Sequence, residues 1–353
     1  MIINITKCLF IRKEINSNEK RVPIVPNDVK KLVENGFTVY IESSSNRIFK
    51  DIDYVDSGAF ITNFYWYDKK FNNFLIIGIK ELDCIEKLDS HTHLYFSHTY
   101  QNQLNSLEIL KNFKKSSSVI YDFEYFYNYD GLNKQRIISF CFFAGFVGAF
   151  LGLKQYLLKK YGLSLTELTY YSSIDDMINH IKSLIDYNTI FDKFKQDLIG
   201  IIGPNGKTGL GAKYLLNLLK IPFKQIYRHT SKNDLDKYSI LLNCIKLDPL
   251  QNETWFSYDK IYYKEIIIVD ISCDYSKSNN PIKIYNDKTT WKNPIYKPNK
   301  FIDIIAIENL PSLLPLDSSI YFSNILTNTL LLDFNSKVWK YNYDKYYEII
   351  ENI

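Results

Sequence analysis

A run of glycines in the second half of the chain has the spacing of a loop that binds an anion. Glycines stand at 203, 206, 209 and 211 in a G-x-x-G-x-x-G-x-G pattern, a variant of the strict G-x-G-x-x-G. An apolar stretch at 198–202 predicts a buried strand before this loop, and residues from about 209 to 219 predict a helix after it. Backbone N–H groups of such a turn and helix N-terminus suit a pyrophosphate. The segment therefore predicts a dinucleotide site, the alternative being a tight βα turn without a ligand.

Titratable side chains follow three predicted strands in the first part of the chain. Lys80 and Glu81 follow one strand, His98 follows the next, and Asp122 and Glu124 follow a third. Ligands of open α/β sheets bind outside the carboxyl ends of the strands, so these groups could share one crevice. Each residue alone is more simply a strand cap or a surface charge. The three strand ends together favour a site.

Two arginines stand where a substrate carboxylate could be bound. Arg21 lies in a loop before the first predicted helix, and Arg136 precedes an aromatic and small-residue helix. A guanidinium group binds a carboxylate through a planar two-pronged fork. The commoner alternative for either arginine is a solvated surface charge. Small residues at 144, 145, 148 and 149 predict close helix packing between domains.

The elements that must position these residues form two βα series. The first has a helix at about 27–36 and the strands 37–42, 74–78, 94–97 and 119–121. The second begins at 201 and has the strands 224–227, 239–244 and 266–270, after which residues 318–353 return as helices to the first domain. We therefore predict an α/β fold of two Rossmann-like doubly wound parallel-sheet domains with an interdomain cleft. The predicted substrate or catalytic domain is 1–139 plus 316–353, and the predicted dinucleotide-binding domain is 140–315.

Length and composition are those of a two-domain globular protein. The chain has 353 residues, against a prior of about 150 residues per domain. Its net charge is +4 without a Lys/Arg block, which makes nucleic acid an unexpected partner. No apolar run reaches the roughly 18 residues of a membrane helix, and the N-terminus lacks a signal-peptide pattern. Five scattered cysteines suit a reducing compartment and no metal site, so we expect a cytoplasmic protein.

The chain resembles the NAD-dependent, L-lysine-forming saccharopine dehydrogenases from about residue 12 to 335, most weakly across 155–197, where no chemistry is identified. The segments that carry the resemblance are Glu-Lys-Arg-Val-Pro-Ile-Val-Pro at 19–26, Ile-Gly-Ile-Lys-Glu at 77–81, Phe-Ser-His-Thr-Tyr at 96–100, Tyr-Asp-Phe-Glu at 121–124, Phe-Phe-Ala-Gly-Phe-Val-Gly-Ala at 142–149, the glycine loop, Val-Asp-Ile-Ser at 269–272 and Leu-Pro-Ser-Leu-Leu-Pro at 310–315. The first segment is shared with alanine dehydrogenases, which have the same two-domain plan.

The resemblance implies a reaction, and it implies a role in that reaction for each candidate site residue of the first domain. Saccharopine would be cleaved oxidatively to lysine and 2-oxoglutarate. This reaction needs a base for the amine proton and an acid–base group for imine hydrolysis. The family's lysine and histidine in these roles match Lys80 and His98. The resemblance further implies that Glu81 and Glu124 tune the charge of this pair. It also implies that the substrate is held by Arg21, Gln103 and Arg136.

The resemblance also implies NAD as cofactor, small-molecule substrates, and no nucleic-acid or membrane partner; we expect a monomer. The predicted cofactor-binding set is Gly203, Gly206, Lys207, Thr208, Gly209, Arg228, His229, Cys244, Asp270, Ser272, Glu308 and Leu310.

The chain departs from the family pattern at several of these places. Asn16 and Gln101 replace basic residues, and Glu308 replaces an aspartate. Arg228 and His229 stand where an acidic residue should hold the adenine ribose, so NADP is not excluded as cofactor. Two alternatives remain: another amino-acid dehydrogenase of the alanine dehydrogenase type, and a dinucleotide-binding relative without catalysis, against which the retained lysine and histidine argue.

Overall fold

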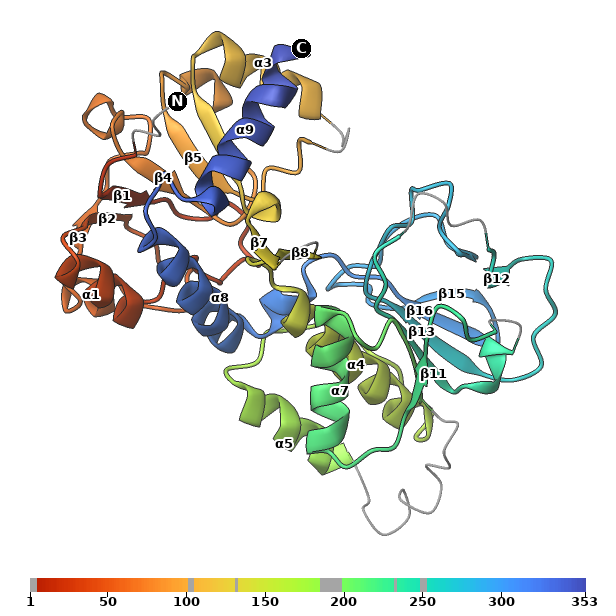
Figure 1. The fold of residues 1–353 in the computed structure, drawn as a ribbon. Helices are drawn as coiled ribbons and strands as arrows, with labels where there is room; N and C mark the ends of the chain where they lie inside the picture. The colour runs from red at the N-terminus through yellow and green to blue at the C-terminus, as the bar shows by residue number, and fades with distance from the viewer. Residues whose placement is uncertain (1–4, 101–104, 131–132, 185–198, 232–233, 248–252) are drawn as a thin grey trace. The chain divides into compact units, whose positions relative to one another are not determined.

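The computed structural model describes residues 5–100, 105–130, 133–184, 199–231, 234–247 and 253–353 (Figure 1). The chain forms two compact units. Unit 1 comprises Met1–Ser139 and Pro315–Ile353, and unit 2 comprises Phe140–Leu314. Each unit is built on its own six-stranded sheet.

The sheet of unit 1 is parallel throughout, in the order β3-β2-β1-β4-β5-β6. Its strands are β1 (Cys8–Ile11), β2 (Thr38–Glu42), β3 (Phe60–Thr62), β4 (Leu75–Ile77), β5 (Thr92–Tyr95) and β6 (Val119–Asp122). All three residues of β4 are buried, as expected for a central parallel strand covered on both faces. The strands expected from the sequence are present, although β5 ends two residues before the predicted 97, and the short edge strand β3 was not predicted.

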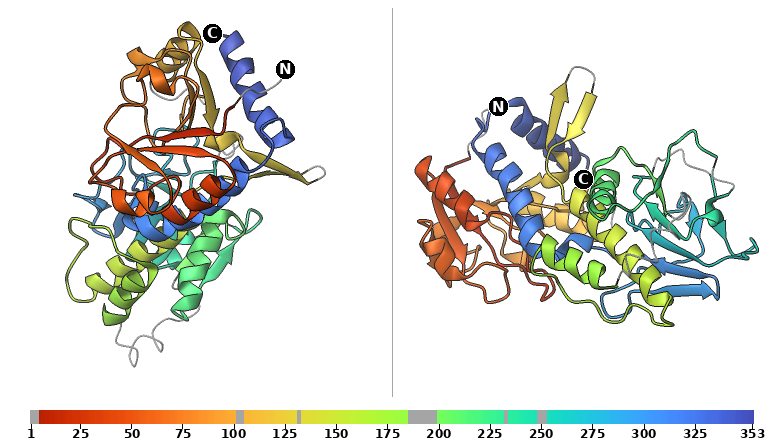
Figure 2. Two further views of the ribbon diagram at one scale, coloured as in Figure 1. Left: turned by 90° about the vertical axis from the view of Figure 1, so that its left-hand side faces the viewer. Right: turned by 90° about the horizontal axis from the view of Figure 1, so that it is seen from below.

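Helices cover both faces of this sheet (Figures 1 and 2). They are α1 (Pro26–Glu34), α2 (Asp51–Val55), α3 (Ser106–Lys115), α8 (Pro315–Leu330) and α9 (Lys337–Glu351). Helix α1 packs on α2 and α8, whereas α3 packs on α9. Phe113 of α3 and Tyr346 of α9 belong to one apolar core with Phe10 and Ile120 of the sheet. A hairpin of β7 (Tyr127–Asp130) and β8 (Asn133–Arg136) follows β6.

The sheet of unit 2 has the order β10-β9-β11-β13-β16-β15, in which only β15 is antiparallel to its neighbour among the described strands. Its strands are β9 (Ile199–Ile202), β10 (Lys224–Ile226), β11 (Ile240–Asn243), β13 (Ile266–Asp270), β15 (Tyr296–Asn299) and β16 (Ile302–Ile305). In β13, Ile267 and Val269 join one apolar core and Ile266 and Ile268 the other. Both faces of the strand are therefore buried, which explains its continuous apolar sequence.

Three helices of unit 2 share one of these cores: α4 (Cys141–Lys159), α5 (Ile174–Leu184) and α7 (Lys207–Leu218). Helices α4 and α7 touch backbone to backbone. A side chain at Gly145 would collide with the carbonyl of Thr208, and one at Gly211 with the carbonyl of Phe142. The small residues of α4 thus serve a contact inside unit 2, which corrects the prediction that they pack between domains.

Two predicted boundaries in unit 2 were also wrong. Helix α7 begins at Lys207, two residues before the predicted start, so the loop between strand and helix is shorter than expected. Helix α4 extends to Lys159 and includes the beginning of the stretch 155–197 that was treated as separate. The expected strand start at Leu198 and the end of that stretch lie outside the described residues.

Helix α4 is, among the described residues, the one helix that passes a length-and-hydropathy test for a membrane span. However, 67% of its apolar window is buried within the protein, as in the core helix of a soluble protein.

The remaining short elements are β12 (Phe256–Ser257), β14 (Ile282–Lys283), and the 3₁₀ turns η1 (Lys69–Phe71), η2 (Ile85–Lys87), η3 (Phe123–Tyr125), η4 (Leu235–Lys237) and η5 (Leu310–Leu313).

Candidate functional site

The backbone around Lys80, just beyond β4, is held by side chains that follow β1. The N–H groups of Ile79 and Lys80 donate to the two oxygens of Glu14, at 2.7 and 3.0 Å. Arg12 donates to the carbonyl oxygen of Lys80, and its Nη1 lies 3.7 Å from Glu14 Oε2. Burial raises the pKa of Glu14, while Arg12 opposes the shift. The strand end is therefore fixed on both sides of Lys80 by groups that the sequence analysis did not select.

The Lys80 side chain is half-buried, and several charged groups act on its pKa. Burial lowers its pKa, and the positive charge of Arg21 lowers it further. The carboxylates of Glu19, Glu81 and Glu14 oppose this shift without cancelling it. A lysine with a lowered pKa can act as a proton acceptor nearer neutral pH than an exposed lysine can.

Arg21 forms a buried pair with Glu19 two residues earlier. Its Nε and Nη2 donate to the two oxygens of Glu19 at 2.7 and 2.6 Å, and both residues are 3% exposed. The fork predicted to hold a substrate carboxylate is thus engaged by a carboxylate of the chain itself. A substrate would have to bind beside Glu19 or in competition with it. The i, i+2 spacing of the two residues was a signal for this pair.

His98 lies beyond β5 in a left-handed backbone conformation, with φ of 52°. Its ring stacks on that of Phe96, with centroids 6.1 Å apart and planes 15° apart. The N–H of Phe96 donates to the carbonyl of Ile79 at 3.3 Å, so the sheet ladder continues between the segments that carry His98 and Lys80. A non-glycine residue at positive φ is uncommon and is over-represented at functional sites.

One buried carboxylate organises the segments around His98 and Glu124. Asp122 accepts the N–H of Ser97 at 3.2 Å and its hydroxyl, and also the N–H of Glu124 at 2.8 Å. Its own backbone N–H and C=O bond to the side chain of Asn342 in α9, at 3.0 and 2.7 Å. Burial raises the pKa of Asp122 to about 7, against the effect of these hydrogen bonds. The sequence analysis placed Asp122 at the strand end but assigned it no role.

The other predicted residues of unit 1 occupy different environments. Arg136, at the end of β8, pairs with Glu124 at 3.0 Å, and both side chains are partly exposed, at 28% and 22%. Glu81 is exposed, and Asn16 lies in the exposed part of the loop before Glu19. Gln103 and Gln101 lie outside the described residues. The structure thus brings Arg21 close to Lys80, and Arg136 close to Glu124.

In unit 2, the glycine loop joins β9 to α7. Gly203 has φ of +76°, a conformation that favours glycine, and its N–H donates to the carbonyl of Ile226 at 3.2 Å. The N-cap residue of α7 is Gly206, which has no side chain. It therefore cannot bond to the backbone N–H groups of the first turn, which contains Lys207 and Thr208. Gly209 lies in that same first turn. A twelve-residue helix that begins in this way presents the donors that a pyrophosphate needs, so the loop fits a dinucleotide.

Polar groups at the ends of β11 and β13 form a compact network around Asp270. Asn243 Nδ2 and Ser272 Oγ donate to Asp270 Oδ1 at 2.9 and 2.6 Å, and the Tyr285 hydroxyl donates to the other oxygen. Asp270 is fully buried, and burial raises its pKa while the hydrogen bonds lower it. Oδ1 of the buried Asn243 has no hydrogen-bond partner among the described residues. Asp270 therefore orients its neighbours, and Asn243 is a polar group that the sequence analysis missed.

Three further predicted cofactor residues differ in exposure. Cys244 is buried, which raises the pKa of its thiol. Leu310 is 2% exposed and packs in the core with α4. Glu308 accepts a hydrogen bond from Lys288 at 2.6 Å at the surface. Cys244 and Leu310 thus occupy packing positions, and Glu308 is the accessible one of the three.

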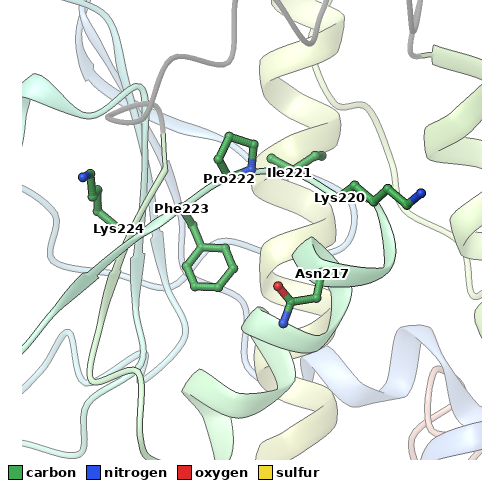
Figure 3. A pocket seen from close by; sticks show the side chains of 6 residues that line it. All are labelled: Asn217, Lys220, Ile221, Pro222, Phe223 and Lys224. Atoms are coloured by element: carbon green, nitrogen blue, oxygen red, sulfur yellow. The ribbon is translucent and has the colours of Figure 1, made fainter.

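Two surface pockets of unit 2 lie at opposite ends of β10. One is lined by Arg228, His229, Thr230 and neighbours beyond the strand. The other lies before the strand, where Asn217, Lys220, Phe223 and Lys224 surround it (Figure 3). Because ligands of this fold bind at the carboxyl ends of strands, the first pocket belongs with the glycine loop and the second does not.

Known proteins are similar to the chain over most of its length. The family of alanine dehydrogenase/PNT N-terminal domains matches residues 10–145. A saccharopine dehydrogenase (NAD(+), L-lysine-forming) of Candida glabrata is 31% identical over 342 residues, covering 91% of this chain and 90% of that protein. The protein of the same name from Yarrowia lipolytica is 30% identical over 343 residues, covering 92% and 91%. A solved L-alanine dehydrogenase shares the fold, with a TM-score of 0.66 and 15% identity, covering 96% and 94%.

Proposed function

We propose a reaction for this chain from one premise: the chain belongs to the family of NAD(+)-dependent, L-lysine-forming saccharopine dehydrogenases. It is an NAD-dependent amino-acid dehydrogenase. The reaction is the reversible oxidative cleavage of saccharopine by NAD and water, which gives L-lysine, 2-oxoglutarate, NADH and a proton. Unit 1 supplies the acid–base groups and the substrate contacts, and unit 2 binds NAD.

The observation that carries the proposal is the environment of Lys80. Its backbone is clamped by Arg12 and Glu14, and burial together with Arg21 lowers the pKa of its side chain. An amine oxidation needs a base of this kind, because the secondary amine of the substrate must lose its proton as the C–N double bond forms.

Lys80 takes the proton from the substrate nitrogen. The glycine loop of unit 2 would hold NAD, and the bound cofactor would supply the hydride acceptor for the carbon next to that nitrogen, so that the substrate would become an imine. His98 then removes a proton from the water that adds to the imine carbon. The same histidine and lysine return protons as the C–N bond breaks, so that lysine leaves as an amine and the former imine carbon becomes the carbonyl of 2-oxoglutarate. Glu81 and Glu124 stabilise the charged states of this pair.

The two carboxylates of the glutarate part need cationic partners, for which we propose Arg21 and Arg136, together with Gln103. Arg136 is the more accessible of the two arginines, and Glu124 holds it in place at 3.0 Å. Arg21 acts jointly with Glu19, whose carboxylate keeps the guanidinium oriented at the buried end of the site.

For NAD we propose the glycine loop, the first turn of α7 and the polar groups beyond β10, β11 and β13. The peptide N–H groups at Gly206, Lys207 and Thr208 would bind the pyrophosphate. Ser272 and Glu308 offer hydrogen bonds farther along the edge, and Asn243 has a buried oxygen that accepts no bond from the described residues.

The match of residues 10–145 to alanine dehydrogenase N-terminal domains supports a second candidate, an amino-acid dehydrogenase of that type. One assay separates the candidates. NADH oxidation is followed with lysine plus 2-oxoglutarate, with each omitted in turn, and with pyruvate plus ammonia. We expect turnover only when lysine and 2-oxoglutarate are both present. Turnover with pyruvate and ammonia alone would favour the second candidate, and nucleotide binding without turnover on any substrate would indicate a relative without catalysis.

A further inference from the structure

The segment beyond β10 bears on which form of the dinucleotide the protein accepts. In this fold an acidic residue near the end of the second strand binds the ribose hydroxyls in NAD enzymes, whereas an arginine there accommodates the 2′-phosphate of NADP. The residues at 224–231 are Lys-Gln-Ile-Tyr-Arg-His-Thr-Ser, without an aspartate or glutamate. The charge that normally repels a 2′-phosphate is therefore absent from this stretch.

This strand end is tied directly to the glycine loop. Ile226 pairs with Ile202 in the parallel ladder between β10 and β9. The N–H of Gly203, the first loop residue, donates to the carbonyl of Ile226 at 3.2 Å. The residues after Ile226 therefore start beside the loop that fits the pyrophosphate, which is where the fold places the adenine ribose.

The turn after Ile226 has a defined conformation. The N–H of Thr230 donates to the carbonyl of Tyr227 at 3.0 Å, and the N–H of Tyr227 donates to the hydroxyl of Thr230 at 3.1 Å. The rings of Tyr227 and His229 stack at 5.7 Å with planes 4° apart. Arg228 lies between them in sequence and is exposed to solvent, as is His229. The turn thus carries a permanent cation, the Arg228 guanidinium, and an imidazole ring at the rim of the pocket.

The charged residues around this pocket include cations, which would attract a phosphate, and a carboxylate, which would repel it. Arg228, His229, Thr230, Ser231 and Lys260 line it together with Glu253. Lys260 forms an ion pair with Asp236 at 3.3 Å, and Glu253 accepts a hydrogen bond from the indole N–H of Trp255 at 3.0 Å. Arg228 and the hydroxyl groups of Thr230 and Ser231 follow directly after the strand that is bonded to the glycine loop, so they are the lining groups that we assign to a phosphate.

We propose that this pocket binds the 2′-phosphate of NADP, so that the protein accepts NADP in addition to NAD. Arg228 binds the phosphate through its guanidinium fork, and Thr230 and Ser231 supply hydroxyl donors. The inference rests on the assignment of unit 2 to the dinucleotide, and it concerns binding rather than the chemistry of unit 1.

Calorimetric titration with 2′,5′-ADP and with 5′-ADP tests the site without any substrate. We expect the wild-type protein to bind 2′,5′-ADP at least as tightly as 5′-ADP. Arg228→Ala should weaken binding of 2′,5′-ADP by about 10- to 150-fold, the range for hydrogen bonds to a charged group, and should leave binding of 5′-ADP nearly unchanged. Lys224→Ala, at the other end of the same strand, is the matched control and should change neither affinity.

The outcomes separate the inference from its premise. Wild-type binding of 5′-ADP that is tenfold or more tighter than that of 2′,5′-ADP would overturn the inference alone. An Arg228→Ala variant that weakens both nucleotides equally would also overturn it, because Arg228 would then bind a part that the two share. If neither nucleotide bound, both the inference and the assignment of unit 2 would be overturned. The absence of saccharopine turnover would affect neither, since the titration involves no substrate.

Discussion

The two sheets differ in what accepts hydrogen bonds from the backbone N–H groups just beyond the carboxyl ends of their strands. In unit 1 the chain places its own carboxylates on them. Glu14 accepts the N–H groups of Ile79 and Lys80, and Asp122 accepts those of Ser97 and Glu124. In unit 2 the corresponding place after β9 is a glycine turn and the start of α7, which Gly206 caps without a side chain.

This difference shows how the same type of sheet can either hold catalytic side chains in place or bind an anion from outside. An internal carboxylate fills an anion site and leaves a fixed negative charge, which orients neighbouring side chains and influences their pKa values. A strand end that is followed by a glycine turn and a helix N-terminus has donors for an anion that comes from outside, such as a pyrophosphate. This contrast supports the proposal that unit 1 carries out proton transfer and that unit 2 binds the cofactor.

The largest expected effect is on kcat when Lys80 is replaced by methionine, which tests the proposed proton transfer in unit 1. Lys80→Met should lower kcat by about 10²–10⁴-fold, the usual contribution of one general acid–base group. The affinity for NADH should remain nearly unchanged, because the proposed cofactor contacts belong to unit 2. The rate of saccharopine oxidation should also lose its rise with pH through the lowered pKa of Lys80, since only the neutral amine can accept a proton.

Steady-state kinetics across pH, with tryptophan-monitored titration of NADH, would check this prediction. Lys87→Met is a matched control, because Lys87 is an exposed lysine of the same unit. A Lys80→Met variant with wild-type kcat and an intact pH profile would show that the base lies elsewhere.

Much of the fold could be predicted from the sequence because parallel strands buried on both faces are continuous apolar runs. The stretch 266–270 coincides with β13, and the glycine spacing identified the turn after β9. The rule that ligands bind at strand ends also selected Lys80 and His98, whose roles remain predictions. Edge strand β3 was missed because three residues carry too little periodicity.

The groups that hold the site in place could not be predicted, because their partners are distant in sequence. Glu14 bonds to the backbone of a residue 66 positions away, and Asn342 bonds to Asp122 across 220 positions. No local pattern reports such a pair. The Glu19–Arg21 pair is local, but its burial, which gives it its electrostatic importance, appears only in the folded structure.

The two arginines proposed to bind the substrate should differ in what their loss does to folding. Arg21→Ala and Arg136→Ala should each raise the KM for 2-oxoglutarate by about 10- to 150-fold relative to that for NADH, because each removes charged hydrogen bonds to the substrate. Only Arg21→Ala should also lower the free energy of unfolding markedly, by about 3–5 kcal/mol, since it removes the guanidinium that bonds to both oxygens of the buried Glu19 carboxylate.

Initial-rate kinetics and denaturant unfolding of both variants would check this difference, with Arg136→Ala as the control for a partly exposed pair. Arg21→Lys keeps the charge without the fork, so it should recover part of the stability but not the KM. An unchanged KM for 2-oxoglutarate in both alanine variants would exclude the two arginines from the substrate site.

Glu14 should matter through Lys80, as a positioning residue. Glu14→Gln replaces one acceptor oxygen by an amide donor that faces a backbone N–H, so kcat should fall by about tenfold, the scale of one or two hydrogen bonds. Loss of the negative charge also removes an electrostatic attraction that raises the pKa of Lys80. The limb of the pH–rate profile assigned to Lys80 should therefore move to lower pH.

A purely structural role for Glu14 would lower the rate without moving this limb, so the pH profile decides between the two roles. Glu34→Gln, an exposed acid at the end of α1, is the control and should change neither quantity.

The smallest expected effect is on the free energy of unfolding at acidic pH, where the buried histidines of unit 1 should matter and the histidines of unit 2 should not. Of the five histidines, the two fully buried ones, His91 and His93 at 1% exposure, belong to unit 1, whereas His180 and His229 in unit 2 are more accessible. Both ring nitrogens of His93 lack a hydrogen-bond partner among the described residues. Burial, and then the positive charges of His91 and Arg12, lower its pKa well below 6.5. The folded protein therefore keeps this ring neutral.

Below pH 6.5 the unfolded chain binds a proton at His93 that the folded chain does not, so stability must fall as the pH falls, by at most about 1.4 kcal/mol per pH unit for this one group. His93→Leu removes the titrating ring without breaking a hydrogen bond, so the variant should lose about 1 kcal/mol less stability than the wild type between pH 6.5 and 5.5. Urea unfolding at the two pH values gives the comparison. His229→Gln, which removes an exposed histidine of unit 2, should follow the wild type. If His93→Leu lost stability as steeply as the wild type, the acid sensitivity of the fold would have to come from groups other than this buried ring.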